Sequence, residues 1–284
     1  MFLNNYILIS IFIFLSTGCS PFKVADILSP YSDYKLNADV SYGTLGRQKL
    51  DVYTPTKTPI SDDIIVFIYG GSWRSGEKSN YRFIAQPFAD AGFIAIVPNY
   101  RLYPEVRFPE FNNDVAKAIA WVHRNFSNSE DLKNIILVGH SAGAHIAALI
   151  SLNPNYLGAE GLSPSIIKSW VSLAGPLAFN PLKTKSIRPI FETIKDDIKQ
   201  AQPINFASKN SPPALLLHGK EDTTVYEKNS LLMAKACENK GVITLQKSFK
   251  NVGHAGLLLS IAKPDFFGVN PIQEIIEFTK QLSD

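Results

Sequence analysis

Short, nearly continuous apolar runs recur along the chain, and they are typical of strands that are covered on both faces of a sheet. They occupy residues 64–69, 93–98, 135–139, 169–174, 214–218 and 243–249. Helical periodicity is clearest at residues 114–126 and 226–239, and it returns in a last segment at residues 272–282. Strands that alternate with helices in this way predict a parallel sheet wrapped by helices.

Two earlier segments, residues 39–43 and 49–53, alternate apolar and polar positions around Gly46. This pattern predicts an antiparallel pair at the sheet edge, and with it a sheet of about eight, mostly parallel strands. Residues 175–209 are richer in proline and charge and show no clear strand. Because ligands bind beyond the carboxyl ends of such strands, we expect this insertion to form a small cap over the binding crevice.

The amino-terminal segment has a different character. Residues 7–15 form an apolar run that is shorter than the ~20 residues of a membrane-spanning helix and that matches the h-region of a signal peptide. Three small residues and then Cys19 follow, which resembles the lipobox of bacterial lipoproteins, where the cysteine is lipidated and becomes the mature amino terminus. The chain departs from that pattern at residues 1–6, which lack Lys and Arg, and at Ser16, because the usual Leu lies one step earlier.

We therefore predict a lipoprotein-type signal peptide at residues 1–18, lipidation of Cys19, a linker at residues 19–38 and one globular domain at residues 39–284. The alternatives are an ordinary cleaved signal with an incidental Cys19, or an uncleaved apolar anchor. Every version places the protein outside the cytoplasm, in the cell envelope. The resemblance implies that acyl chains on Cys19 tether the globule to a membrane, and that Ser20 directs it to the outer membrane of a double-membraned bacterium.

A candidate nucleophile lies in the pentapeptide Gly-His-Ser-Ala-Gly at residues 139–143, between a predicted strand and the helix-like residues 144–152. A Gly-x-Ser-x-Gly turn in this context strains the serine backbone and projects its hydroxyl at the helix N-terminus. Ser141 is therefore the predicted nucleophile. Because a serine hydroxyl is weakly nucleophilic at neutral pH, it needs a base within reach and a carboxylate that orients the base.

Two loops after predicted strands supply these groups. Asp222 follows the strand at residues 214–218, and His254 follows the strand at residues 243–249, which gives the order Ser, Asp, His that this architecture uses. Glu221 could substitute as the acid, although Asp222 has the favoured position after the turn. Of the remaining histidines, His140, His145 and His218 are expected to be structural, and His123 falls on a predicted exposed helix.

Attack on a carbonyl also needs donors for the negative charge that develops on its oxygen. The segment from Tyr69 to Trp73 follows a predicted strand, and its two glycines allow the backbone to turn its amides toward a ligand. We expect the N–H groups of Gly71, Ser72 and Ala142 to form an oxyanion hole, the alternative being that the glycines merely shape a loop. Trp73 is expected either to line the acyl or alcohol pocket or to pack under this loop.

Composition narrows the classes of function. A hydrophobic content of 45% excludes a disordered chain, and 28 Lys+Arg against 25 Asp+Glu leave a net charge of only +3 with no basic stripe, which argues against nucleic-acid binding. We find no Cys/His ligand cluster and no dinucleotide glycine fingerprint, so we predict neither a metal nor an organic cofactor. Cys237 is expected to be a small buried apolar residue.

Taken together, these residues resemble the α/β-hydrolases, in particular the esterase and lipase group of hormone-sensitive-lipase-like and feruloyl or acetyl-xylan esterase-like enzymes. The resemblance covers about residues 39–282, and besides the triad it includes residues 69–76, 100–105, 108–109, 114 and 203–225. It implies an α/β-hydrolase catalytic domain in which Arg101, Glu105 and Asp114 are bracing charges. The chain departs from the family at Tyr69, where a histidine usually braces the oxyanion loop.

The resulting hypothesis is a serine carboxylic-ester hydrolase that acts through an acyl-enzyme on small or medium esters. One alternative is an arylformamidase-type amide hydrolase with the same triad. Another is a non-catalytic binding protein of the cell envelope that retains the hydrolase fold.

Overall fold

The computed structural model describes residues 25–26, 34–59, 61–126 and 135–282. The predicted signal peptide, Cys19 and most of the predicted linker lie outside these residues. In the part of the chain that is described, no helix is both long and apolar enough to cross a bilayer.

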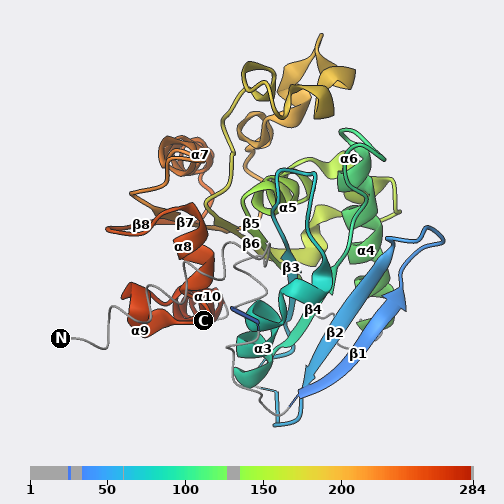
Figure 1. Ribbon diagram of the computed structural model, residues 1–284, viewed down its shortest axis with the longest axis vertical. Helices are drawn as coiled ribbons and strands as arrows, with labels where there is room; N and C mark the ends of the chain where they lie inside the picture. Colours follow the sequence, from blue (N-terminus) through green and yellow to red (C-terminus); the bar gives the residue numbers. More distant parts are fainter. Residues whose placement is uncertain (1–24, 27–33, 60, 127–134, 283–284) are drawn as a thin grey trace, which may run out of the picture.

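The described residues form an eight-stranded sheet in the spatial order β1-β2-β4-β3-β5-β6-β7-β8 (Figure 1). Strand β2 pairs antiparallel with both of its neighbours, and every other pair is parallel. This confirms the predicted sheet with an antiparallel pair at its edge. The strands are β1 Tyr34–Ser41, β2 Lys49–Pro55, β3 Ile64–Ile68, β4 Ile94–Pro98, β5 Ile135–His140, β6 Ile167–Leu173, β7 Ala214–Gly219 and β8 Thr244–Phe249.

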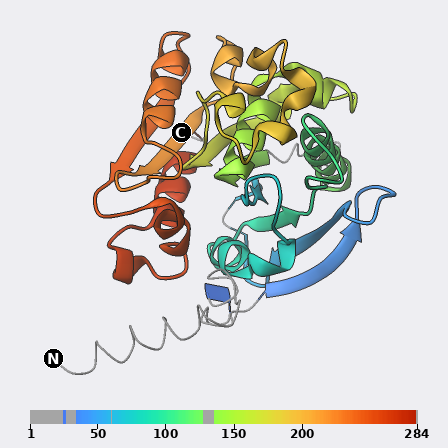
Figure 2. The ribbon, with the colours of Figure 1, turned by 45° about the horizontal axis from the view of Figure 1, so that its top comes forward.

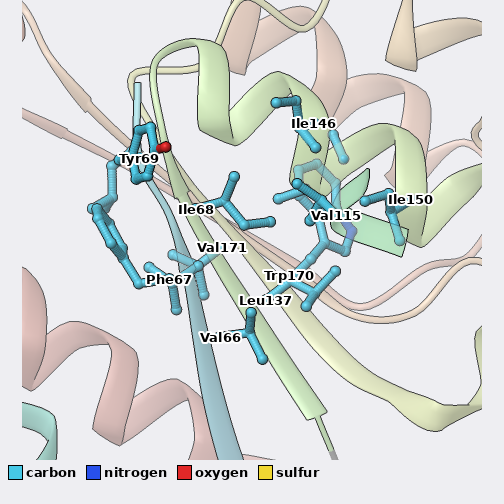
Figure 3. Packing of buried hydrophobic residues seen from close by; sticks show 14 of the residues in the cluster. Val66, Phe67, Ile68, Tyr69, Val115, Leu137, Ile146, Ile150, Trp170 and Val171 are labelled. Carbon is cyan, nitrogen blue, oxygen red and sulfur yellow. The ribbon is translucent and has the colours of Figure 1, made fainter. Parts of the chain in front are cut away.

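The central strands are covered on both faces, which explains their continuous apolar sequences. Every residue of β3, β5 and β7 is buried. Val66, Leu137 and Trp170 lie side by side on β3, β5 and β6, and Ile146 packs nearby (Figure 3). Strand β8 differs from the prediction: all its residues are only half-buried, because it is the last strand of the sheet.

Helices cover both faces of the sheet, with α4 and α5 on one side and α3 and α10 on the other (Figures 1 and 2). The periodic segments predicted as helices correspond to α4, α7 and α10, with small shifts at their ends. The α-helices are α3 Arg82–Asp90, α4 Glu110–Phe126, α5 Ala142–Leu152, α6 Pro154–Gly158, α7 Lys228–Glu238, α8 His254–Leu259, α9 Pro264–Phe267 and α10 Pro271–Gln281.

The first strand begins at Tyr34, earlier than predicted and within the segment expected to be a linker. The sequence of β1 alternates apolar and polar residues over its full length, but most of its side chains are exposed, and only Tyr34 and Val40 are half-buried. The strand is held instead by its ladder to β2 and by packing of the Tyr34 ring on Tyr53, with ring centroids 5.3 Å apart. Its pairing with β2 shifts between Asn37 and Val40.

The segment between β6 and β7 is the predicted cap, and it lies above α5 in gold in Figure 1. It consists of short 3-10 helices, several of which have proline in their first turn, so that none grows into a regular α-helix. These helices are η3 Pro181–Lys183, η4 Arg188–Ile190, η5 Glu192–Ile194, η6 Ile198–Ala201 and η7 Pro203–Phe206.

Candidate active site

Ser141 occupies the sharp turn between β5 and α5. Its backbone has φ 54° and ψ −121°, a conformation that is strained for a residue with a side chain. Its N–H donates to the carbonyl oxygen of Leu173 at 2.9 Å, which fixes the turn to β6. The flanking glycines are sterically required, because a Cβ on Gly139 would lie 2.4 Å from the carbonyl oxygen of Gly143, and one on Gly143 would lie 2.0 Å from that of Ile68.

The structure brings Ser141, Asp222 and His254 together in one hydrogen-bonded series. His254 Nε2 lies 2.8 Å from Ser141 Oγ, and His254 Nδ1 lies 2.7 Å from Asp222 Oδ2. With Nδ1–H donating to the carboxylate, Nε2 is free to accept the hydroxyl proton. The three residues come from loops at the carboxyl ends of β5, β7 and β8, as the sequence predicts.

The carboxylate of Asp222 is buried and bonded at both oxygens. Its Oδ1 accepts the N–H groups of Thr224 and Val225 at 2.9 and 2.8 Å. Although burial opposes ionisation, contacts with His218 and His254 and the Val225 N–H bond hold the pKa of Asp222 well below its usual value. Asp222 therefore remains an ionised acceptor for His254.

His140 lies beside His254 and supports its backbone. The Nε2 atom of His140 donates to the carbonyl oxygen of His254 at 3.2 Å, and the two ring centroids are 4.8 Å apart. Burial, together with the nearby His254, lowers the pKa of His140 to about 3. The ring therefore stays neutral beside the candidate base.

Among the described residues, none of the competing candidates is hydrogen-bonded to the Ser141 hydroxyl, whose partner is His254. Glu221 is exposed, whereas its neighbour Asp222 is the residue that bonds His254. The other histidines occupy different settings: His123 lies on α4, His145 bonds the carbonyl oxygen of Ala201, and His218 bonds Ser230 and Val225.

The loop after β3 presents backbone N–H groups beside the elbow. A Cβ on Gly70 would lie 2.9 Å from the Cβ of Ser141, so the two segments are in direct contact. Positive φ angles of 108° at Gly71 and 54° at Ser72 turn this loop. Within the described residues, no acceptor bonds the N–H groups of Gly71, Ser72 or Ala142, and these groups remain available to a ligand oxygen.

Tyr69, the residue between β3 and this loop, is held in place by several contacts. Its hydroxyl donates to Asn99 Oδ1 at 2.8 Å and accepts from Arg47 Nη2 at 2.9 Å. The Tyr100 hydroxyl donates to the carbonyl oxygen of Tyr69 at 2.8 Å, and the Tyr69 ring stacks between those of Tyr81 and Tyr100. These contacts anchor the end of β3 from which the loop departs.

Trp73 packs under the cap and is only 3% exposed. Its ring stacks on Phe179 with centroids 6.0 Å apart and meets Phe191 edge-on at 5.0 Å. Of the two roles predicted for Trp73, the structure shows packing. We call this group of rings the aromatic cluster; its members are Trp73, Phe108, Phe111, His145, Phe179 and Phe191.

Of the three residues that the resemblance implied as bracing charges, Arg101 and Asp114 are paired and Glu105 is not. Arg101 bonds both oxygens of the buried Asp114, at 2.8 Å from Nε and 2.9 Å from Nη2. Its second carboxylate partner is Glu110, at 3.3 Å. Glu105 is exposed and has no bonded partner among the described residues, so this expectation was wrong. The turn of α4 brings Glu110, which is nearer to Asp114 along the chain, to the guanidinium instead.

The described residues contain no group of three His, Cys, Asp or Glu side chains that could hold a metal ion. What they do hold is a hydroxyl, an imidazole and an ionised carboxylate in series, next to unbonded backbone donors. This arrangement can generate an alkoxide and stabilise the tetrahedral intermediate of an acyl transfer.

Comparison with known proteins gives a consistent picture. The family model BD-FAE matches residues 50–237. A probable carboxylic ester hydrolase, LipM, of Mycobacterium tuberculosis is 28% identical over 70% of this chain, which spans about half (51%) of that relative's length. Kynurenine formamidase of Salmo salar is 24% identical, over 80% of this chain and 78% of its own.

Solved structures share the fold. A truncated form of a carbohydrate esterase from gut microbiota superposes with a TM-score of 0.74 at 24% identity, covering 90% of this chain and 99% of its own. Inhibited esterase B from Lactobacillus rhamnosis gives a TM-score of 0.76 at 17% identity, covering 98% of this chain and 97% of its own. At these identities the likeness establishes the sheet topology and its helices.

Proposed function

This chain belongs to the BD-FAE family, within the esterase group of the α/β-hydrolases, and from that membership and the geometry of the site we propose that it is a serine carboxylic-ester hydrolase. The observation that carries the proposal is the hydrogen-bonded series from Ser141 through His254 to Asp222, at 2.8 and 2.7 Å. A relative named as a probable carboxylic ester hydrolase supports it.

In the proposed reaction, Ser141 Oγ attacks the ester carbonyl carbon while His254 Nε2 takes the hydroxyl proton. Asp222 holds the imidazole in the required tautomer and stabilises its charge. The N–H groups of Gly71, Ser72 and Ala142 receive the negative charge on the carbonyl oxygen. His254 then protonates the leaving alcohol, and a water molecule deprotonated by His254 releases the acid from the acyl-enzyme.

The test is replacement of the nucleophile. Ser141→Ala should lower the turnover of p-nitrophenyl acetate by roughly a millionfold. Ser151→Ala is the matched control, since Ser151 is a buried serine on α5, the helix that follows Ser141, and its hydroxyl has no partner among the described residues. A fluorophosphonate should label the wild type and Ser151→Ala but not Ser141→Ala. Ester turnover retained by Ser141→Ala would refute the proposal.

A second candidate is amide hydrolysis of the arylformamidase type. Kynurenine formamidases are among the relatives, and the same triad can cleave a formamide. Small or medium esters are the favoured substrates, and an aryl formamide measured beside an ester series of graded chain length decides between the two. A folded protein that neither cleaves these substrates nor reacts with fluorophosphonate would instead be a binding protein that retains the fold.

We also propose that the protein is exported and tethered to a membrane of the cell envelope through acylated Cys19. The support is the sequence of residues 7–20. In cells, Cys19→Ser should move the protein from the membrane to the soluble fraction of the envelope, since a doubly or triply acylated anchor is needed for stable attachment. Mass spectrometry of the mature amino terminus checks the modification, and an unmodified or absent Cys19 would reject it.

A further inference from the structure

A second histidine lies behind the Asp222 carboxylate, and the proposed mechanism does not use it. His218 is the penultimate residue of β7 and is fully buried. Its Nε2 lies 2.7 Å from the carbonyl oxygen of Val225 and 3.3 Å from Asp222 Oδ2. Its Nδ1 lies 2.8 Å from the hydroxyl of Ser230, a buried residue of α7.

These partners fix the orientation of the ring. A carbonyl and an ionised carboxylate only accept, so Nε2 must carry a hydrogen. In the neutral ring Nδ1 then accepts the hydroxyl hydrogen of Ser230. The side chain cannot flip without losing both bonds, since a flip would place carbon atoms against the carbonyl and the hydroxyl.

The ring acts on Asp222 in two ways. First, His218 Nε2–H donates to the carbonyl oxygen of Val225, and the N–H of Val225 donates to Asp222 Oδ1 at 2.8 Å. The ring therefore fixes the turn whose N–H group binds one oxygen of the carboxylate. Second, the same Nε2–H edge faces Oδ2, the oxygen that accepts from His254. The Asp222 carboxylate therefore contacts two imidazoles, those of His218 and His254, and of these two His254 is the one that is bonded to Ser141.

We propose that His218, locked by Ser230, is a positioning residue that orients the Asp222 carboxylate toward His254. The inference rests on the proposed function, because it assigns a role within the same triad. Removing the ring should leave substrate binding largely intact and slow the chemical steps, because the misplaced carboxylate no longer fixes the tautomer of His254.

The first experiment compares His218→Leu with His218→Gln, whose side-chain amide places an N–H donor near the position of Nε2. His218→Leu should lower kcat for p-nitrophenyl acetate on the order of 10- to 100-fold, the range known for the hydrogen-bond partners that orient metal ligands, with KM changed by less than about threefold. His218→Gln should recover most of this loss. An unchanged kcat in a folded His218→Leu protein would overturn the inference.

A double-mutant cycle separates positioning from general packing. In an Asp222→Ala background, His218→Leu should reduce kcat/KM by less than about threefold, because the group through which it acts is gone. The same fold loss in both backgrounds would show a merely structural role and overturn the inference. If His218→Leu does not fold, Ser230→Ala takes its place in the cycle, since it removes one hydroxyl and unlocks the ring.

The two hypotheses fail in different ways. A wild-type protein without ester turnover and without fluorophosphonate labelling rejects the proposed function, and the inference falls with it. An active wild type whose kcat is insensitive to His218 and Ser230 rejects the positioning role alone.

Discussion

At the scale of single residues, Tyr69 shows how one side chain can replace another in a supporting role. A histidine usually stands at this place in the resembled enzymes, and here the phenol bonds Asn99 and Arg47 instead. Both partners keep other bonds, because Asn99 Oδ1 also accepts the N–H of Lys78 and Arg47 Nε also donates to the carbonyl oxygen of Tyr100. Asn99 and Arg47 should therefore keep their positions through these other bonds when the Tyr69 hydroxyl is removed.

Tyr69→Phe should lower the free energy of unfolding by about 2 to 3 kcal/mol, because the hydroxyl makes two hydrogen bonds, one of them with a charged group, and should leave kcat within about twofold of the wild type. Urea denaturation and p-nitrophenyl acetate turnover measure the two quantities. A tenfold fall in kcat with unchanged stability would show instead that the hydroxyl takes part in the reaction.

At the scale of elements, the geometry of the site depends on the close packing of the first turn of α5 against the end of β3. The first turn of this helix lies so near the end of β3 that Gly143 has no room for a side chain: a Cβ would lie 2.0 Å from the carbonyl oxygen of Ile68 and 2.5 Å from that of Tyr69. The atoms it would meet are backbone, so they cannot move aside as a flexible side chain could. Close helix–strand contact therefore sets the position of Ser141 relative to the loop after β3.

Gly143→Ala should destabilise the fold by about 1 to 3 kcal/mol through overpacking and should also reduce kcat, because the elbow and the loop after β3 are pushed apart. Gly158→Ala at the end of α6 is the control, since a Cβ there meets nothing within 4 Å. Thermal unfolding and ester turnover of the two variants give the comparison. Equal effects from both substitutions would contradict the steric argument.

At the scale of the whole molecule, buried neutral histidines link the stability of the fold to pH. His145 is fully buried in the aromatic cluster, and it joins α5 to the cap through its bond to the carbonyl oxygen of Ala201 at 2.8 Å. Burial lowers the pKa of His145 to about 4, and that of His140 is lowered to about 3. Between about pH 6.5 and these values the unfolded chain binds protons that the folded chain does not, so stability falls as pH falls.

For His145 this loss amounts to about 3 kcal/mol between about pH 6.5 and about pH 4. His145→Gln keeps a donor for Ala201 but does not titrate, so its stability should decline less steeply over this interval. Below about pH 3.8 the depressed pKa of Asp222 adds a further loss in both proteins. Urea denaturation at a series of pH values tests this, and parallel curves for the two proteins would disprove it.

The sequence predicted the sheet, and it predicted that Ser141, Asp222 and His254 come together, because each of them lies in the turn or loop that follows a predicted strand. It did not predict the start of β1, although the apolar–polar alternation from Tyr34 to Ser41 was a signal for it; the strand is mostly exposed and is placed by its ladder to β2. The aromatic cluster was also missed, because it joins residues from four separate segments. His218 was predicted only as a structural residue; its spacing from Asp222 was a signal, but its bond to Ser230 depends on how α7 packs on β7.

The strand order has a consequence for synthesis. The residue that would activate Ser141 stands after β8, which is added to the sheet beside β7. A nascent chain leaving the ribosome amino end first can complete the turn at Ser141 and the loop after β3 while His254 is still untranslated. Such a chain has no general base for its serine, so hydrolytic competence should arise abruptly and late, when the final strand docks.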